Sequence, residues 1–313
     1  MFTKYMFNSL VYNPAFAGSP EYMRIRLLYR NQWVSMEGAP ESQSFTIHSP
    51  VNEKIGLGLS LLNDKIGVTG STTANVSYAY RLLLGPGKLS IGLQAGIANW
   101  RADWNQLRFR EPQETDVAFS NIEENQWLPN FGAGVFYYSK LWYAGFSVPR
   151  LLQNDLRTNS GSSVTVTEAS RLYRHYFITA GAALPLAGDD LIFKPSILIK
   201  NVGLFGAFGA SGTNLFQVGA PTEIDIDASL FMFETLWLGI SFRSSIEAFV
   251  GDKSTVDSFD VWASLYLNNG IRIGAAYDQT LTKLSPFVDG SFELMLGYDF
   301  DYEVKKMNTP RYF

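Results

Sequence analysis

The feature that most constrains this chain is an alternation of apolar residues with polar or small ones, which begins at Tyr22 and continues almost to residue 302. In residues 55–61 every odd position is isoleucine or leucine, and every even position is glycine or serine. Successive side chains of a strand point to opposite faces, so a period of two predicts β-strands. Each predicted strand therefore has one continuous apolar face and one polar face.

Two environments can accept such strands. A soluble β-sandwich buries the apolar faces against a second sheet, whereas a transmembrane barrel turns them toward lipid and encloses a polar interior. Charged residues make up 17% of the chain, below the roughly 25% of typical soluble domains. Aromatic residues, at 15%, are abundant. This composition favours a surface that is not wholly in water.

The lengths of the connections favour the barrel. The alternation divides into fourteen segments, and the connections after even-numbered segments are short. Those after odd-numbered segments are mostly longer, with two long polar insertions at 101–127 and 150–171. An even strand number with short turns at one end is typical of outer-membrane barrels, whose short turns are periplasmic. We therefore predict a 14-stranded antiparallel transmembrane β-barrel over residues 22–302, with an N-terminal periplasmic arm (1–21) and a C-terminal periplasmic tail (303–313).

Several other classes of protein are disfavoured. The net charge is −4 and no basic run is present, so we expect no nucleic-acid partner. The absence of cysteine excludes disulfides and thiolate sites. In the sequence as given, no signal peptide and no apolar run long enough for a transmembrane helix are predicted. The expected location is the outer membrane, in contact with its lipid.

Catalytic and metal sites have little support. His48 and His175 are the two histidines, and a serine hydrolase would need one of them as its base. His48 falls on a polar strand face and His175 lies just inside a strand, so both are interpreted as wall residues. The pair Asp189 and Asp190 has no recognisable ligand spacing and is expected to end a hairpin. We predict no enzymatic activity, no cofactor and no metal.

The predicted inward faces carry charges of opposite sign at the two ends of the chain. Closure of a barrel brings the first and last strands together, so these charges could meet in salt-bridged networks. Two interpretations stay open: a partly plugged interior, or a polar channel or docking cavity. A fourteen-strand interior is too wide for side chains alone to fill. The candidate lumen charges are Arg24, Arg26, Arg30, Arg81, Asp225, Asp227, Asp260, Glu293 and Asp299.

Several segments resemble one known family. They include YNPAFAGS at 12–19, YRNQW at 29–33, NDKIG at 63–67, PNFG at 129–132, YAGFSVP at 143–149 and PRYF at 310–313. These motifs closely resemble the PorP/SprF family of outer-membrane proteins, and the likeness extends over the whole chain.

The resemblance implies a non-enzymatic role in the type IX secretion system and in gliding motility. PorP-like members are associated with subunits of a periplasmic secretion ring, whereas SprF-like members export or anchor the C-terminal domain of a secreted surface adhesin. The motifs do not separate these branches. The alternative function, from the barrel alone, is a diffusion pore or transport channel for small solutes.

Two motifs are candidate partner contacts, each with a structural alternative. Asn13, Pro14 and Gly18 could shape an arm that closes the periplasmic mouth, or contact a partner. Asn63, Asp64 and Lys65 could organise the loop after the third strand, or contact a partner at the extracellular rim.

Overall fold

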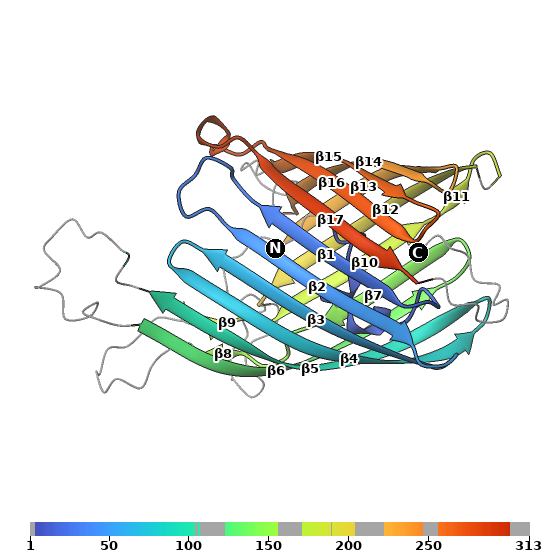
Figure 1. Cartoon of the computed structure of the whole chain (residues 1–313), viewed down its shortest axis with the longest axis horizontal. Helices are drawn as coiled ribbons and strands as arrows, with labels where there is room; N and C mark the ends of the chain where they lie inside the picture. Colours follow the sequence, from blue (N-terminus) through green and yellow to red (C-terminus); the bar gives the residue numbers. More distant parts are fainter. Residues whose placement is uncertain are drawn as a thin grey trace, which may run out of the picture.

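The computed structural model describes residues 4–103, 106, 123–155, 171–188, 190–203, 222–246 and 256–300. In these residues one antiparallel sheet closes on itself as a barrel (Figure 1). Without the two-residue β11 (Leu184–Pro185), the fifteen-stranded sheet contains fourteen barrel strands, which confirms the predicted number. They are β1 (Arg24–Asn31), β2 (Glu41–Pro50), β3 (Ile55–Ile66), β4 (Thr69–Leu84), β5 (Gly87–Asp103), β6 (Glu123–Tyr138), β7 (Trp142–Val148), β10 (His175–Ala182), β12 (Leu191–Val202), β13 (Glu223–Met232), β14 (Leu236–Ser245), β15 (Val256–Tyr266), β16 (Ile271–Thr280) and β17 (Ser291–Asp299).

Two sets of strand pairings complete the ring. Strands β1 and β17, the first and last, pair from Arg24 opposite Asp299 to Asn31 opposite Phe292. Strand β10 pairs with both β7 and β12, so the ring continues past the insertion that separates β7 from β10. Within that insertion, β8 (Asn154–Asp155) and β9 (Arg171–Leu172) form a separate two-stranded sheet.

The alternation in the sequence corresponds to the two faces of the wall. On β17, Leu294 and Leu296 are about half exposed, at 50% and 51%, whereas Glu293 and Met295 are buried at 0% and 4%. Exposed apolar side chains recur at alternate positions around the outer surface, for example Leu93, Val261 and Ile273. Such a belt is stable next to hydrocarbon and would be costly in water.

The two ends of the barrel differ. We call the end with the turns 51–54, 85–86, 139–141, 183–190, 233–235 and 267–270 the short-turn end, and the opposite end the long-loop end. Strand β1 begins and β17 finishes at the short-turn end. That this end is periplasmic remains a prediction. No helix in the described ranges is long and apolar enough to cross a membrane.

Strand boundaries differ from prediction beside the first insertion. Strand β5 continues to Asp103 and β6 already begins at Glu123, so both extend into the predicted loop 101–127. They pair there up to Asp103 opposite Glu123. Alternation disappears from these strand ends because polar residues are used on both faces, and for that reason the sequence pattern did not reveal them.

Candidate functional site

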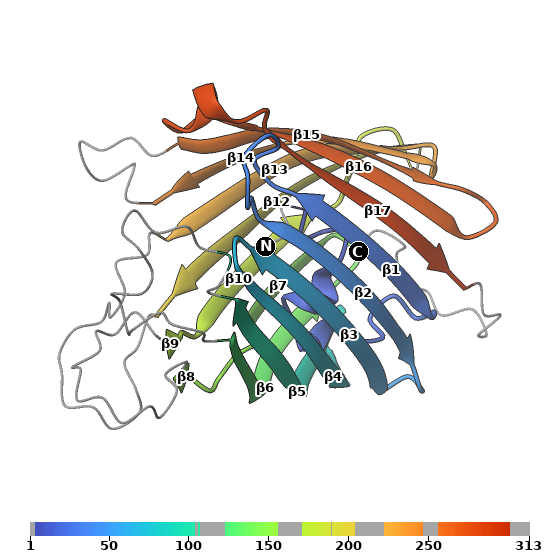
Figure 2. The ribbon, with the colours of Figure 1, turned by 60° about the vertical axis from the view of Figure 1, so that its left-hand side comes forward.

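The interior of the barrel contains the chain's own N-terminal segment. Residues 4–20, which we call the N-terminal plug, lie inside the ring of strands, as Figure 2 shows in dark blue. Leu10 is 1% exposed and Ala15 is 0% exposed. The arm expected to close the periplasmic mouth is thus folded into the lumen, where it fills space that wall side chains cannot.

Local sequence explains the compact form of the plug. It contains two short 3-10 turns, η1 (Ser9–Val11) and η2 (Pro14–Phe16). The Asn13 side chain caps η2 by accepting a hydrogen bond from the Ala15 N–H at 2.9 Å. Pro14 occupies the first position of the turn, where its fixed φ and missing N–H cost nothing. Asn13 and Pro14, candidate partner contacts by sequence, are placed inside the barrel.

Strands β2 and β4 bind the plug through side chains. Asn8 donates to Ser44 Oγ at 3.3 Å and accepts from Thr46 Oγ1 at 3.0 Å. His48 Nδ1 accepts the Gly18 N–H at 3.1 Å, and Arg81 donates to the Gly18 carbonyl oxygen. His48 is therefore a wall residue whose imidazole holds the plug.

Strands β5 and β7 bind the backbone of the plug. Ser90 Oγ donates to the Ala15 carbonyl at 2.6 Å, and Ser147 Oγ donates to the Tyr12 carbonyl at 2.7 Å. Gly92 permits this approach, because a Cβ there would overlap the backbone of Ala15. Small wall residues thus let the plug backbone lie directly against the strands.

The start of the plug makes an ion pair that the sequence pattern did not predict. Lys4 Nζ lies 2.8 Å from Asp260 Oδ2 and 3.6 Å from Asp227 Oδ1, and all three side chains are 1% exposed. Lys4 also donates to Ser241. No alternation marks Lys4, since it precedes the first strand.

Aromatic packing completes the attachment of the plug on this side. The Phe7 ring packs edge-on against Trp262 at 5.5 Å, and the Tyr5 hydroxyl donates to Ser196 Oγ at 2.7 Å. Contacts from the plug thus reach strands on every side of the lumen.

The predicted charges of β1 meet carboxylates of neighbouring strands. Arg24 Nε and Arg26 Nη1 lie 3.3 and 2.7 Å from Asp299 Oδ1. Arg30 lies 3.0 Å from Asp278 Oδ2 and 3.6 Å from Glu293 Oε2. These ion pairs join β1 to β16 and β17, at the seam where the first and last strands pair.

The remaining predicted charges have other partners. Asp225 lies 2.6 Å from Arg243 Nε and 2.8 Å from Lys200 Nζ, both on adjacent strands. Arg81 donates to the backbone carbonyls of Asn52 and Ile55 at 2.7 and 3.1 Å rather than to a carboxylate. Arg243, Lys200 and Arg272 were not selected by sequence, although the same alternation assigns them to inward positions.

The remaining partner-contact candidates, and His175, lie at the long-loop end. Asp64 accepts from Ser42 Oγ at 2.5 Å, Asn63 accepts from Thr72 Oγ1 at 2.9 Å, and Lys65 is exposed. His175 Nδ1 is 3.1 Å from the Tyr173 carbonyl oxygen. The described residues contain no group of three or more histidines and carboxylates that could hold a metal ion. Asp189 lies outside the described residues, whereas Asp190 lines the cavity described next.

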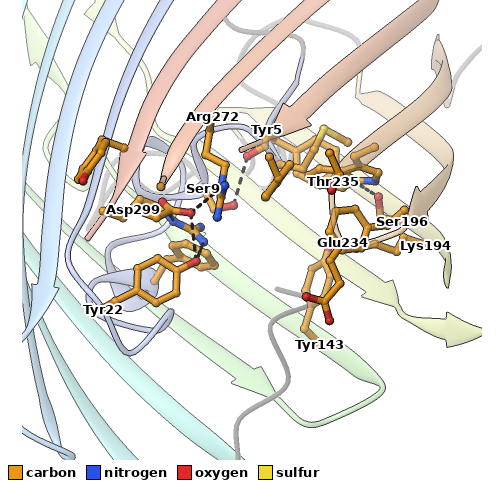
Figure 3. A pocket seen from close by; sticks show the side chains of 18 of the residues that line it. Tyr5, Ser9, Tyr22, Tyr143, Lys194, Ser196, Glu234, Thr235, Arg272 and Asp299 are labelled. Carbon is orange, nitrogen blue, oxygen red and sulfur yellow. Dashed lines mark hydrogen bonds and ion pairs between the residues drawn. The ribbon is translucent and has the colours of Figure 1, made fainter. Parts of the chain in front are cut away.

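A cavity of about 740 Å³ lies between the plug and the short-turn end (Figure 3). We call it the mouth cavity. The plug residues Tyr5 and Tyr12 line it from within, and the turns 233–235 and 267–270 form part of its rim. Arg272 and Asp299 lie on one side, with Lys194 and Glu234 on the other. Arg24, which also lines the cavity, lies 3.3 Å from Asp299. The arrangement can bind or dock another molecule, and neither histidine lines it.

Comparison with known proteins gives one family match and several structural similarities. The family model described as "Type IX secretion system membrane protein PorP/SprF" matches residues 1–298. No curated protein sequence matches the chain. Among solved structures, Acinetobacter baumannii Omp33 is similar over 90% of this chain and 98% of its own, at 8% identity and a TM-score of 0.43. Salmonella typhi OmpF in complex with daunomycin covers 90% and 99%, at 9% identity and a TM-score of 0.39. At these values the similarities say nothing about function.

Proposed function

The chain belongs to the PorP/SprF family of type IX secretion system membrane proteins, and we propose that it works there as a non-enzymatic docking barrel for a secreted protein. It is an outer-membrane β-barrel, and its leading proposed role is to hold the C-terminal domain of a secreted surface adhesin. Coupling to periplasmic subunits of the secretion ring is the second form of the same role.

The observation that carries this proposal is the bonded plug. A barrel used for diffusion needs a continuous water-filled lumen, whereas here residues 4–20 are hydrogen-bonded and ion-paired to the surrounding wall. Each of these contacts would have to break before a wide path could form. A barrel filled by its own bonded segment is better suited to present rigid surfaces than to conduct solutes.

Loops on a rigid scaffold usually carry specificity, so we place the adhesin contact at the long-loop end. The paired ends of β5 and β6 extend the wall at this end. The small sheet of β8 and β9 lies within the other long insertion. The residues between these strand ends lie outside the described ranges. Asn63, Asp64 and Lys65 remain candidate contacts at the same end.

Affinity purification from native membranes tests the proposal. The tagged full-length barrel is extracted in a gentle detergent, and the proteins that accompany it are identified by mass spectrometry. A large secreted adhesin in the eluate supports the leading role, and periplasmic ring subunits support the second form. A barrel recovered without any secretion component would contradict both.

Loop deletions then locate the contact. Removing residues 107–120 or 157–169 should lose the adhesin and leave the heat-modifiable barrel at its normal level. Removing residues 247–255, from another loop at the long-loop end, provides the matched control and should leave the adhesin bound. Retention of the adhesin after both test deletions would place the contact elsewhere on the barrel.

A further inference from the structure

The mouth cavity has an unusual distribution of charge on one side. Asp299 is ion-paired with three arginines: Arg24 and Arg26 lie 3.3 and 2.7 Å from its Oδ1, and Arg272 Nε donates to its Oδ2 at 2.9 Å. Among the described residues, three guanidinium groups share this one carboxylate, so the cluster has an excess of two positive charges. Arg26 is turned into the wall and 4% exposed in its side chain, whereas Arg24 and Arg272 line the cavity.

Both cavity-lining arginines have N–H groups left over. Arg24 donates through Nη2 to the Tyr22 hydroxyl at 2.7 Å, and its Nε lies 3.3 Å from Asp299 Oδ1 without forming a hydrogen bond. Arg272 uses Nε toward Asp299 and Nη1 toward the Leu267 and Ile271 carbonyls. In the described part of the chain, no acceptor is bonded to Arg24 Nη1 or to Arg272 Nη2. Guanidinium groups prefer carboxylates and phosphates as partners.

Aromatic rings hold both guanidinium groups in place. The Arg272 Cζ atom lies 4.5 Å from the Tyr266 ring centroid, and the Arg24 Cζ atom lies 5.3 Å from the Tyr22 ring centroid. Stacking on a ring leaves the edge of the guanidinium group, with its N–H donors, available for an acceptor. The site is therefore preorganised and loses little side-chain entropy when an anion binds.

The rest of the lining indicates what kind of molecule carries the anion. Its apolar surface is largely aromatic, and the wall strands separate it from lipid. Phe231 and Trp237 pack against Tyr266, the ring on which Arg272 lies. Asn268, Asn269 and Thr235 at the rim offer amide and hydroxyl groups of the kind that bond a peptide backbone. The aliphatic residues among the described lining are Met6, Ala182, Pro195 and Leu267, too few to form a tunnel for a long acyl chain.

We propose that the mouth cavity is a second binding site, which takes an acidic, aromatic-containing segment of a partner protein whose carboxylates bind Arg24 and Arg272. The site lies at the opposite end of the barrel from the proposed adhesin contact and goes beyond that role. The two proposals can be tested separately, because the loop deletions described above leave every residue that lines the mouth cavity in place.

Fluorescence anisotropy with the full-length barrel in detergent micelles tests the proposal. The probe is a short labelled peptide in which glutamate alternates with tyrosine and phenylalanine. The same peptide with glutamine in place of glutamate is the neutral comparison. Acidic probe should bind saturably, and neutral probe should bind at least about tenfold more weakly, since hydrogen bonds to charged groups contribute about 1.5–3 kcal/mol. Equal binding of the two probes to the unmodified barrel would by itself overturn the proposal.

Two substitutions locate the site. Arg24→Gln together with Arg272→Gln should weaken the acidic probe by about tenfold or more while Arg26 still pairs with Asp299. Arg101→Gln, an exposed arginine at the other end of β4–β5, is the matched control and should change nothing. Unchanged binding by the folded double variant would overturn the assignment.

Two further results would assign the cavity to another occupant. Displacement of the acidic probe by millimolar inorganic phosphate would indicate a phosphate site instead of a peptide site. If a barrel shortened to end at Phe300 binds the probe and the full-length barrel does not, the cavity is assigned instead to residues 301–313 of this chain, which include Asp301 and Glu303.

Discussion

Lys4 Nζ lies 2.8 Å from Asp260 Oδ2, and this contact joins the first described residue of the chain to a strand 256 positions later. Asp227 lies within 3.6 Å of the same ammonium group. The plug is thus attached to β13 and β15 by a buried cation between two carboxylates. Removing one member of such a group leaves an uncompensated charge, which costs more than the pair itself contributes.

Lys4→Met should therefore lower the free energy of unfolding by about 3–5 kcal/mol. Denaturant titration of the barrel in lipid vesicles measures the change. Lys65→Met, at an exposed position of the long-loop end, is the control and should be nearly neutral. Adding Asp227→Asn and Asp260→Asn to Lys4→Met should recover much of the loss, because no charge is then left unpaired. Failure of that rescue would show that the ion pair is not what holds this end of the plug.

Gly92→Val should displace the plug without breaking the wall, since a side chain there would occupy the position of the Ala15 backbone. A cysteine introduced at Ala15 in this cysteine-free chain reports the change. It should resist a thiol reagent in the otherwise unchanged barrel and react in the Gly92→Val variant. Ala95→Val, on the exposed face of the same strand, is the control. Equal reactivity in all three proteins would mean that the plug is not held as described.

The period of two predicted the strands well because one physical requirement acts along the whole wall. Every second side chain faces hydrocarbon, and Leu294 and Leu296 on β17 are examples. At the ends of β5 and β6 this requirement no longer holds, and the sequence therefore did not predict those strand residues. The plug sequence has no periodicity, because each plug residue packs against a different part of the barrel interior.

Pairing of the lumen charges depends on strand register, which the pattern does not supply. Sequence reasoning placed arginines of the first strand opposite the carboxylates near the end of the chain, and Arg26 does reach Asp299. Asp225, however, pairs with Arg243 because β13 and β14 place the two residues directly opposite each other.

Leu294→Arg should destabilise the inserted barrel by about 2–4 kcal/mol, the cost of a cation near the middle of the lipid-facing band. Leu294 is 50% exposed on the outer face, at the middle of β17. Reversible unfolding in vesicles gives the value, and Leu294→Phe is the apolar control. A loss no larger than that of the control would mean that this face does not contact lipid.

Orientation in the membrane is tested by labelling from outside intact cells. Single cysteines at Asn121 and Asn159, in the two long insertions, should react with an impermeant thiol reagent. A cysteine at Asn269, in the turn between β15 and β16, should react only after the membrane is opened. The reverse pattern would place the short-turn end at the cell surface and exchange the two proposed binding faces.

Current across planar lipid bilayers tests the central claim, that the chain is a barrel closed by its own N-terminal segment and used for docking. Purified full-length protein should insert without stable large conductance. A barrel lacking residues 4–20 serves as the positive control for insertion and should conduct, because nothing then fills the lumen between the strands. Stable, wide conductance from the full-length protein would contradict the account and support a diffusion pore instead.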